Sequence, residues 1–223
     1  MRASTARAKS GWIGVLAVLA GLVLAACGGS SGGPSGDARS TAARPEATGP
    51  AEAVFLDPKR YAPHLDPPPA GMRVLASGYF GEEGFEGTLG DAMRDAEFVR
   101  GYQIAVGSEV EGSIANVVIL FRTEAGAKKG YAALLERMAH TTSDVGQGAK
   151  VTVPADIGAE RAGVRVVAPI NGSDTLFARI FFRYRNAVDI TIGTATPVEP
   201  RAVAVAKLVS DLMTSGQISP LAA

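Results

Sequence analysis

The chain has 223 residues and a formal net charge of zero, with 22 basic and 22 acidic residues. Its first 27 residues contain three basic residues and no acidic one, so the rest of the chain carries 19 basic against 22 acidic residues. Proteins that bind nucleic acids carry a basic surplus that engages phosphates. The composition therefore argues against nucleic acid as a partner.

The first residues have the pattern of an export signal. Arg2, Arg7 and Lys9 precede an uncharged apolar run from Trp12 to Leu24, and small residues follow it. The run has 13 residues, whereas a membrane-spanning helix needs about 20. This pattern predicts a signal peptide over residues 1–26 rather than a retained transmembrane helix.

The segment Leu24-Ala25-Ala26-Cys27 resembles the lipobox of bacterial lipoproteins. The resemblance implies that Cys27 is lipidated and becomes the first residue of the mature protein. The protein is then expected at the extracytoplasmic face of the cell membrane, with the membrane as its partner through the lipid on Cys27. Cys27 is also the only cysteine, so the mature domain is expected to contain no disulfide.

Composition divides the mature chain into three parts. Residues 27–53 hold the lipidated cysteine and a Gly-, Ser-, Pro- and Ala-rich stretch that predicts a disordered tether. Residues 54–216 predict a single domain, which is long enough to bury roughly 70% of its unfolded surface. Residues 217–223 are expected to form a short tail.

Apolar periodicity predicts the elements of the first half of the domain. Thr88, followed by Asp91, resembles a capping box that starts a short helix. The unbroken apolar run at residues 117–121 predicts a central strand that is buried on both faces. In chain order we expect a strand over Arg73–Tyr79 and a loop over Gly81–Gly90. Two paired strands follow, over Tyr102–Val106 and Ser113–Arg122. A helix over Ala125–Ala139 and a polar loop over Thr142–Gly148 come next.

The next elements are a short strand over Val164–Val167 and a hairpin. The hairpin arms are Thr175–Arg183 and Ala187–Ile192, and Asn186 is expected to take positive φ in the turn between them. Alternation along the first arm predicts one buried face and one mixed face.

A closing helix has a clear start signal. Thr196 as the cap, Pro197 at the first helical position and Glu199 at the third satisfy the capping-box and N1-proline rules. Gly216 is the expected stop, and the apolar stripe is Ala202, Val205, Val209 and Leu212. All elements together predict an α+β fold with a mainly antiparallel sheet of about five to seven strands and two or three packed helices.

The predicted domain shows no motif for nucleophilic or zinc-dependent catalysis. Its residues 54–216 contain neither a Gly-x-Ser-x-Gly nor a His-Glu-x-x-His sequence. The two histidines, His64 and His140, are far apart and are interpreted as structural. We therefore expect no enzyme, no metal and no cofactor.

Acidic residues gather around the predicted loop and helix start, at Glu82, Glu83, Glu86, Asp91 and Asp95. Calcium loops need alternating acids around a turn-forming glycine, and that spacing is absent. A solvated acidic loop is the favoured interpretation. The alternative is an envelope glycan enzyme that uses Glu82 or Asp91, which requires two carboxyl groups about 5–5.5 Å apart if it retains configuration.

Three arginines on the hairpin are the candidate contact residues. Arg179, Arg183 and Arg185 fall on one face and could hold an anion or an acidic partner. The alternative is a solvated sheet face with charges that prevent aggregation. Phe177 and Phe181 alternate with these arginines, so part of this face is expected to be covered, either as core or by a ligand.

The body of the chain resembles uncharacterised bacterial secreted or lipid-anchored proteins, and its layout is similar to that of Mog1/PsbP-like lipoproteins. The matching pieces are Pro69–Met72, Arg100–Tyr102, Leu120–Ala125 and Ile157–Glu160, with Ala159 where such proteins would have Asp. The resemblance implies a curved antiparallel sheet with packed helices and no particular chemistry.

The first functional hypothesis is therefore a non-enzymatic, membrane-anchored lipoprotein that binds a small hydrophobic or envelope ligand, or a partner protein, on an open sheet face. The alternatives are the carboxylate-dependent glycan enzyme and a purely structural accessory lipoprotein.

Overall fold

The computed structural model describes residues 57–61, 68, 70–85, 87–108, 112–145, 149–170, 173–194 and 197–215. The side chains of residues 138–145, 168–170 and 173 are not described. The predicted signal peptide, the predicted lipidation site Cys27, the predicted tether and tail, His64, Glu86 and Gly216 lie outside the described residues, as does the side chain of His140.

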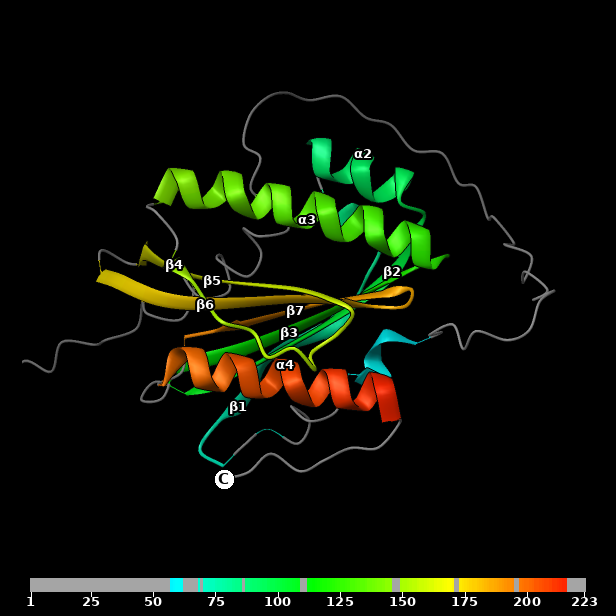
Figure 1. Cartoon of the computed structure of the whole chain (residues 1–223). Helices are drawn as coiled ribbons and strands as arrows, with labels where there is room; N and C mark the ends of the chain where they lie inside the picture. The colour runs from blue at the N-terminus through cyan, green and yellow to red at the C-terminus, as the bar shows by residue number, and fades with distance from the viewer. Residues whose placement is uncertain are drawn as a thin grey trace, which may run out of the picture.

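One antiparallel sheet of seven strands forms the centre of the molecule, in the order β1-β2-β3-β7-β6-β5-β4 (Figure 1). Three α-helices, α2, α3 and α4, and the short 3-10 helices η1 and η3 complete the described elements. The predicted α+β class is confirmed. The strands are β1 (Arg73–Phe80), β2 (Phe98–Ser108), β3 (Gly112–Phe121), β4 (Ala149–Lys150), β5 (Glu160–Ile170), β6 (Ser173–Tyr184) and β7 (Ala187–Gly193), and the helices are η1 (Pro58–Tyr61), η3 (Glu82–Gly84), α2 (Gly87–Asp95), α3 (Glu124–Val145) and α4 (Val198–Ser215).

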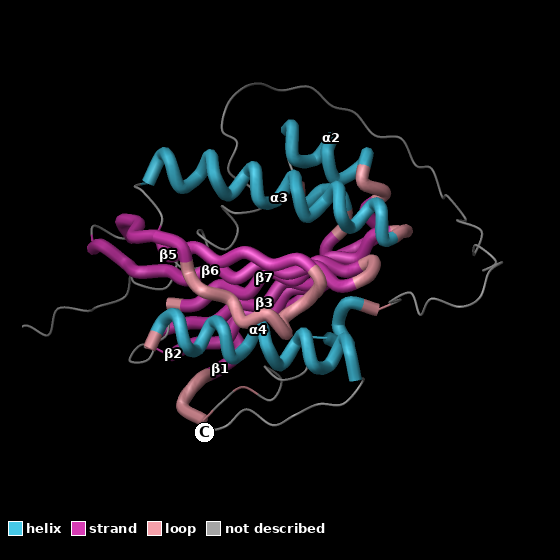
Figure 2. Tube along the Cα trace, in the orientation of Figure 1, coloured by secondary structure: helices cyan, strands magenta, loops and turns pink. Residues whose placement is uncertain are grey.

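Helices cover both faces of the sheet. Figure 2 shows α2 and α3 on one side and α4 on the other. Both faces of the sheet therefore carry core residues, because the alternate residues of each strand point to opposite faces. Phe177 and Phe181 pack with Met93 and Tyr131 under α2 and α3, whereas Ile180 and Phe182 pack with Ala206 and Val209 under α4. The prediction of an open sheet face is therefore wrong.

β3 is the buried central strand that its apolar run predicts. Ile119 and Phe121 belong to the core under α3, while Val118 and Leu120 belong to the core under α4. β2 and β7 pair with its two edges. An apolar run without alternation suits a strand that is covered on both faces.

Several predicted boundaries differ from the structure. β2 (Phe98–Ser108) and β5 (Glu160–Ile170) are longer than the predicted strands Tyr102–Val106 and Val164–Val167. The predicted loop at Gly81–Gly90 instead contains a 3-10 turn, and α2 begins at Gly87, which has φ +56°. The predicted loop at Thr142–Gly148 is partly wrong, because α3 continues to Val145. A helix propagates from its nucleated part at little cost, and neither Gly nor Pro occurs between Ala139 and Val145.

The β6–β7 hairpin is confirmed, but Arg185 rather than Asn186 has the positive φ, at +50°. The buried Asn186 instead stabilises the turn through hydrogen bonds to β3. Its side-chain amide donates a hydrogen bond to the Phe121 carbonyl at 2.9 Å, and its own carbonyl accepts one from the Phe121 N–H at 2.9 Å. Asn186 therefore joins the turn to the end of β3, and the adjacent residue makes the left-handed bend.

α4 begins one residue later than predicted. Pro197 precedes Val198, and its carbonyl accepts the hydrogen bond from the Arg201 N–H at 3.1 Å. The predicted apolar stripe is confirmed, since Ala202, Val205, Val209 and Leu212 are all buried. Within the described residues, no helix combines the length and apolar character needed to cross a membrane.

Candidate functional site

The face of β6 that lies under α3 carries two of the predicted arginines. Phe177, Arg179, Phe181 and Arg183 alternate along this face and are 2%, 4%, 0% and 6% exposed. The interpretation of this surface as a solvated sheet face is wrong for Arg179 and Arg183, because helices cover it. Phe177 and Phe181 are core residues.

Arg183 is a buried arginine whose guanidinium is well satisfied. Its Nε and Nη2 donate to Glu160 Oε1 at 3.2 and 3.0 Å, and its Nη1 donates to Glu124 Oε1 at 3.0 Å and to the Arg185 carbonyl at 3.2 Å. Glu160 begins β5 and Glu124 begins α3. Arg183 therefore ties the start of α3 to the sheet.

Arg179 lies four residues earlier on the same face and has no such partners. Its Nε and Nη1 are buried, and neither has a hydrogen-bond partner in the described part of the chain. Burial lowers the pKa of its guanidinium, because desolvation disfavours the charged form. The structure thus separates two arginines that the sequence places in one group.

Arg185 belongs to the turn rather than to this face. Its guanidinium lies 5.7 Å from the centre of the Tyr184 ring, and its backbone carbonyl accepts the bond from Arg183. The three arginines therefore have different environments and form no single anion clamp.

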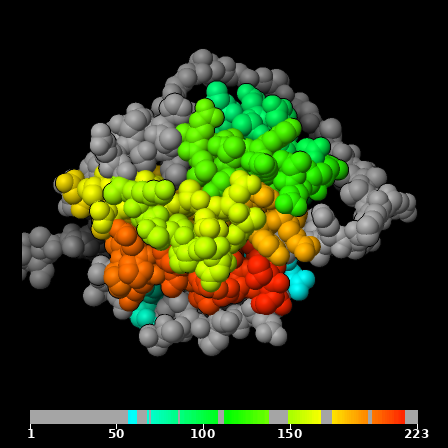
Figure 3. All heavy atoms as spheres, in the orientation of Figure 1, coloured from blue at the N-terminus to red at the C-terminus, as the bar shows by residue number. Residues whose placement is uncertain are grey.

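A pocket of about 420 Å³ opens beside Arg183, between α3 and the start of β5. Tyr131 and Leu135 from α3 line one wall, and Ala159, Glu160 and Arg161 line the other. In the space-filling view, the green α3 lies against the yellow-green residues around the start of β5 (Figure 3). Burial, with a smaller effect from Glu160, raises the pKa of Tyr131 to about 12, so its hydroxyl is neutral and can donate at physiological pH.

The acidic residues near α2 do not converge on a cation site. Glu82 lies 3.7 Å from Arg94 Nε and Asp91 lies 3.0 Å from Arg94 Nη1, with all three side chains exposed. Glu83 accepts a hydrogen bond from the Gly81 N–H at 2.9 Å, and backbone hydrogen bonds lower its pKa. The described residues contain no group of three or more side chains that could together hold a metal ion.

A buried polar cluster on the α4 face of the sheet was missed by sequence reasoning. Asp189 on β7 is wholly buried; it accepts hydrogen bonds from Asn116 Nδ2 at 2.5 Å and from Thr191 Oγ1 at 3.0 Å. Burial raises the pKa of Asp189 to about 7, although these two bonds lower it. The sequence does hold a signal for this cluster. Asp189 is an acidic residue within an otherwise apolar strand, and Asn116 lies within a second apolar strand.

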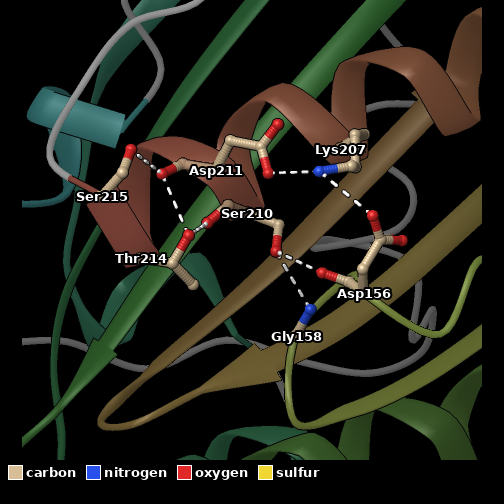
Figure 4. Close-up of polar contacts among 7 residues, drawn as sticks. All are labelled: Asp156, Gly158, Lys207, Ser210, Asp211, Thr214 and Ser215. Atoms are coloured by element: carbon tan, nitrogen blue, oxygen red, sulfur yellow. Dashed lines mark hydrogen bonds and ion pairs between the residues drawn. The ribbon is translucent and has the colours of Figure 1, made fainter.

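A second polar network fastens the segment before β5 to α4 (Figure 4). Ser210 Oγ accepts a hydrogen bond from the Gly158 N–H at 3.0 Å. Lys207 lies 3.2 Å from Asp156 Oδ2 and also pairs with Asp211; its bond to Asp211 is the main cause of its raised pKa. These contacts fix the path of the chain into Ala159 and Glu160, which line the pocket.

Replacement of Gly158 by Ala should destabilise the domain by about 2 kcal/mol or more, because Gly158 has φ +60° and an added Cβ would lie 2.8 Å from Phe182 Cδ2 and 2.9 Å from the Arg183 carbonyl oxygen. Gly78→Ala is the matched control, since a Cβ there meets nothing within 4 Å. Chemical denaturation measures both variants. Equal stabilities for the two would contradict the role assigned to Gly158.

No protein-family model matches the chain, and a comparison with curated proteins also found no match. Among solved structures, the crystal structure of the extracellular domain of PknH from Mycobacterium tuberculosis is similar to this chain at 13% identity. The similarity covers 70% of this chain and 91% of that one, with a TM-score of 0.34. A likeness this weak assigns no function, which must come from the residues of this chain.

Proposed function

We propose that the chain is a non-enzymatic lipoprotein, anchored through Cys27 at the extracytoplasmic face of a bacterial membrane, that binds a small hydrophobic or envelope ligand. The observation that carries the binding role is the pocket between α3 and β5. Its volume of about 420 Å³ lies within the range of small-ligand sites, and its lining combines Leu135 with Tyr131 and Glu160.

The proposed binding site replaces the open sheet face as the contact surface. Gly158, held by Ser210, positions one wall, and Arg183, held by Glu124 and Glu160, joins the other wall to the sheet. A preorganised pocket of this kind favours binding because less order has to be created when the ligand enters. The glycan-enzyme alternative has no comparable support, since Glu82 and Asp91 are both exposed and share Arg94.

Native mass spectrometry of the protein released from its own membranes tests the binding role. We expect a non-covalent mass in addition to the covalent lipid. Leu135→Glu should lose that mass because a charge in the apolar part of the pocket is unfavourable. Ala132→Glu is the control, since Ala132 is exposed on the same helix. The absence of any bound mass, or a mass that survives Leu135→Glu, would contradict the proposal.

Replacement of Cys27 by Ala should prevent lipidation, because no other cysteine is present to take the lipid. We expect the variant to leave the membrane fraction or to keep its signal peptide, and fractionation with immunoblotting measures both. The parent protein, which has the same export signal and keeps Cys27, is the control. Normal processing together with full membrane retention would rule out the lipid anchor.

A further inference from the structure

The pocket between α3 and the start of β5 has two arginines close to the hydroxyl group of Tyr131. Burial and Glu160 raise the pKa of this hydroxyl, whereas Arg161 and Arg183 lower it. Because the effect of one charge on another fades with distance, both guanidinium groups lie near the hydroxyl. The two arginines differ in what else they contact.

The protein itself neutralises Arg183. Its guanidinium donates to Glu124 Oε1 and to Glu160 Oε1 at 3.0 Å each, and to the Arg185 carbonyl at 3.2 Å. Its side chain is only 8% exposed. Arg183 is therefore a fixed part of the pocket's frame, and Glu160, the one carboxylate that lines the pocket, is bound to it.

Arg161 is the arginine that lines the pocket and remains available to a ligand. It is half-buried, and its guanidinium forms neither an ion pair nor a hydrogen bond with the described residues. Arg165 lies four residues further along β5 and does have a carboxylate partner, Glu199 at 2.8 Å. Arg161 thus adds a positive charge to the pocket that no described carboxylate pairs with.

The other lining residues suit a small molecule with one charged end. Leu135 and Ala159 supply apolar surface on the two walls. Tyr131, with a pKa of about 12, keeps its proton and can donate it to an acceptor. Glu160, Arg161 and Arg183 together carry one net positive charge, so an anion is favoured over a cation. A guanidinium beside a hydroxyl donor suits a carboxylate or a phosphate.

We propose that the pocket binds a small amphipathic anion, whose carboxylate or phosphate group pairs with Arg161 and accepts a hydrogen bond from Tyr131. The apolar part of the ligand lies against Leu135 and Ala159. The inference rests on the proposed binding role and adds the chemical class of the ligand to it. Arg161 is then the residue that distinguishes an acidic ligand from a neutral one of the same size.

Calorimetric titration of the protein carrying Cys27→Ser, which has no covalent lipid, tests this inference. The probes are hexanoic acid, hexyl phosphate and hexanol, which share one chain length. We expect at least one acidic probe to bind about ten-fold or more tightly than hexanol, because hydrogen bonds to a charged group are the stronger ones. The comparison of the two acidic probes distinguishes a carboxylic acid from a phosphate ester as the source of the anion.

Variants link the preference to Arg161. Arg161→Gln should bring the acidic probe to the affinity of hexanol, and Arg161→Lys should keep a preference for the acid because the charge remains. Arg165→Gln is the matched control, since it removes the same charge from an exposed position on the same strand. It should bind all three probes as the parent protein does.

The outcomes separate this inference from the proposed function. Equal binding of acid and alcohol by the parent protein would overturn the acidic class and leave the pocket as a site for neutral ligands. A preference that survives Arg161→Gln, or that Arg165→Gln removes equally, would overturn the role of Arg161. A neutral molecule in the native mass spectrum would also overturn the acidic class. Failure of all three probes, together with an empty protein in that spectrum, would contradict both proposals.

Discussion

Replacement of Arg179 by Met should make the ligand-free domain more stable, by about 2 kcal/mol. The variant removes a buried charge whose Nε and Nη1 have no hydrogen-bond partner in the described part of the chain. It places an apolar side chain among Phe177, Phe181 and Ile192 instead. For a domain of this size the gain corresponds to a rise in Tm of roughly 4–8 °C. Most core substitutions destabilise a protein. A gain in stability would therefore identify Arg179 as an unfavourable buried charge.

Arg183→Met is the matched comparison and should have the opposite sign. It leaves Glu124 and Glu160 without their cation, and because their side chains are 52% and 36% exposed, the loss should be only about 1–3 kcal/mol. Urea denaturation of the parent protein and both variants measures the difference. Destabilisation by Arg179→Met equal to that of Arg183→Met would show that Arg179 has a counter-charge in the folded protein.

Replacement of Asp189 by Asn should remove most of the pH dependence of stability between about pH 4 and pH 7. The folded protein raises the pKa of Asp189 from 3.8 to about 7, chiefly through burial. A carboxyl group with a raised pKa is protonated in the folded protein at a pH where it is already ionised in the unfolded chain. Its stabilising contribution is therefore complete below about pH 4 and is lost as the pH rises to about 7.

The parent protein should consequently lose up to about 4 kcal/mol from this group between pH 4 and pH 8, and Asp189→Asn should be the more stable protein at pH 8. Asn is nearly isosteric, and its amide can still bond to Asn116 and Thr191. Thermal unfolding at a series of pH values measures the effect, with Asp91→Asn on the exposed face of α2 as the control. Parallel profiles for the parent and Asp189→Asn would contradict the buried, protonated carboxyl.

The class of the fold could be predicted because several elements carry strong local patterns. The run at residues 117–121 indicates a strand buried on both faces, and the stripe from Ala202 to Leu212 indicates a helix with one apolar face; both are confirmed. Periodicity shows which residues are buried, but not which strand lies beside another. The pairing of β3 with β7 therefore could not be derived from the sequence.

The candidate site was predicted only in part. Alternation of arginine and phenylalanine correctly marks one face of β6, but the burial of Arg179 and Arg183 depends on α3, which starts about sixty residues earlier in the chain. The partners of Arg183 come from α3 and β5, so they could not be identified from local spacing. The lipobox at Cys27, the tether and the Mog1/PsbP-like layout stay predictions.

The strand order has a consequence for how the domain folds. β1, β2 and β3 form one meander and β4 to β7 form another, and the two meet only where β3 pairs with β7. Asn116 and Asp189 hydrogen bond across this seam, and a shift of one residue would turn the side chains of one strand to the opposite face of the sheet and break the pair. We therefore expect the buried polar pair to favour this one alignment of the two halves over alignments shifted by a residue.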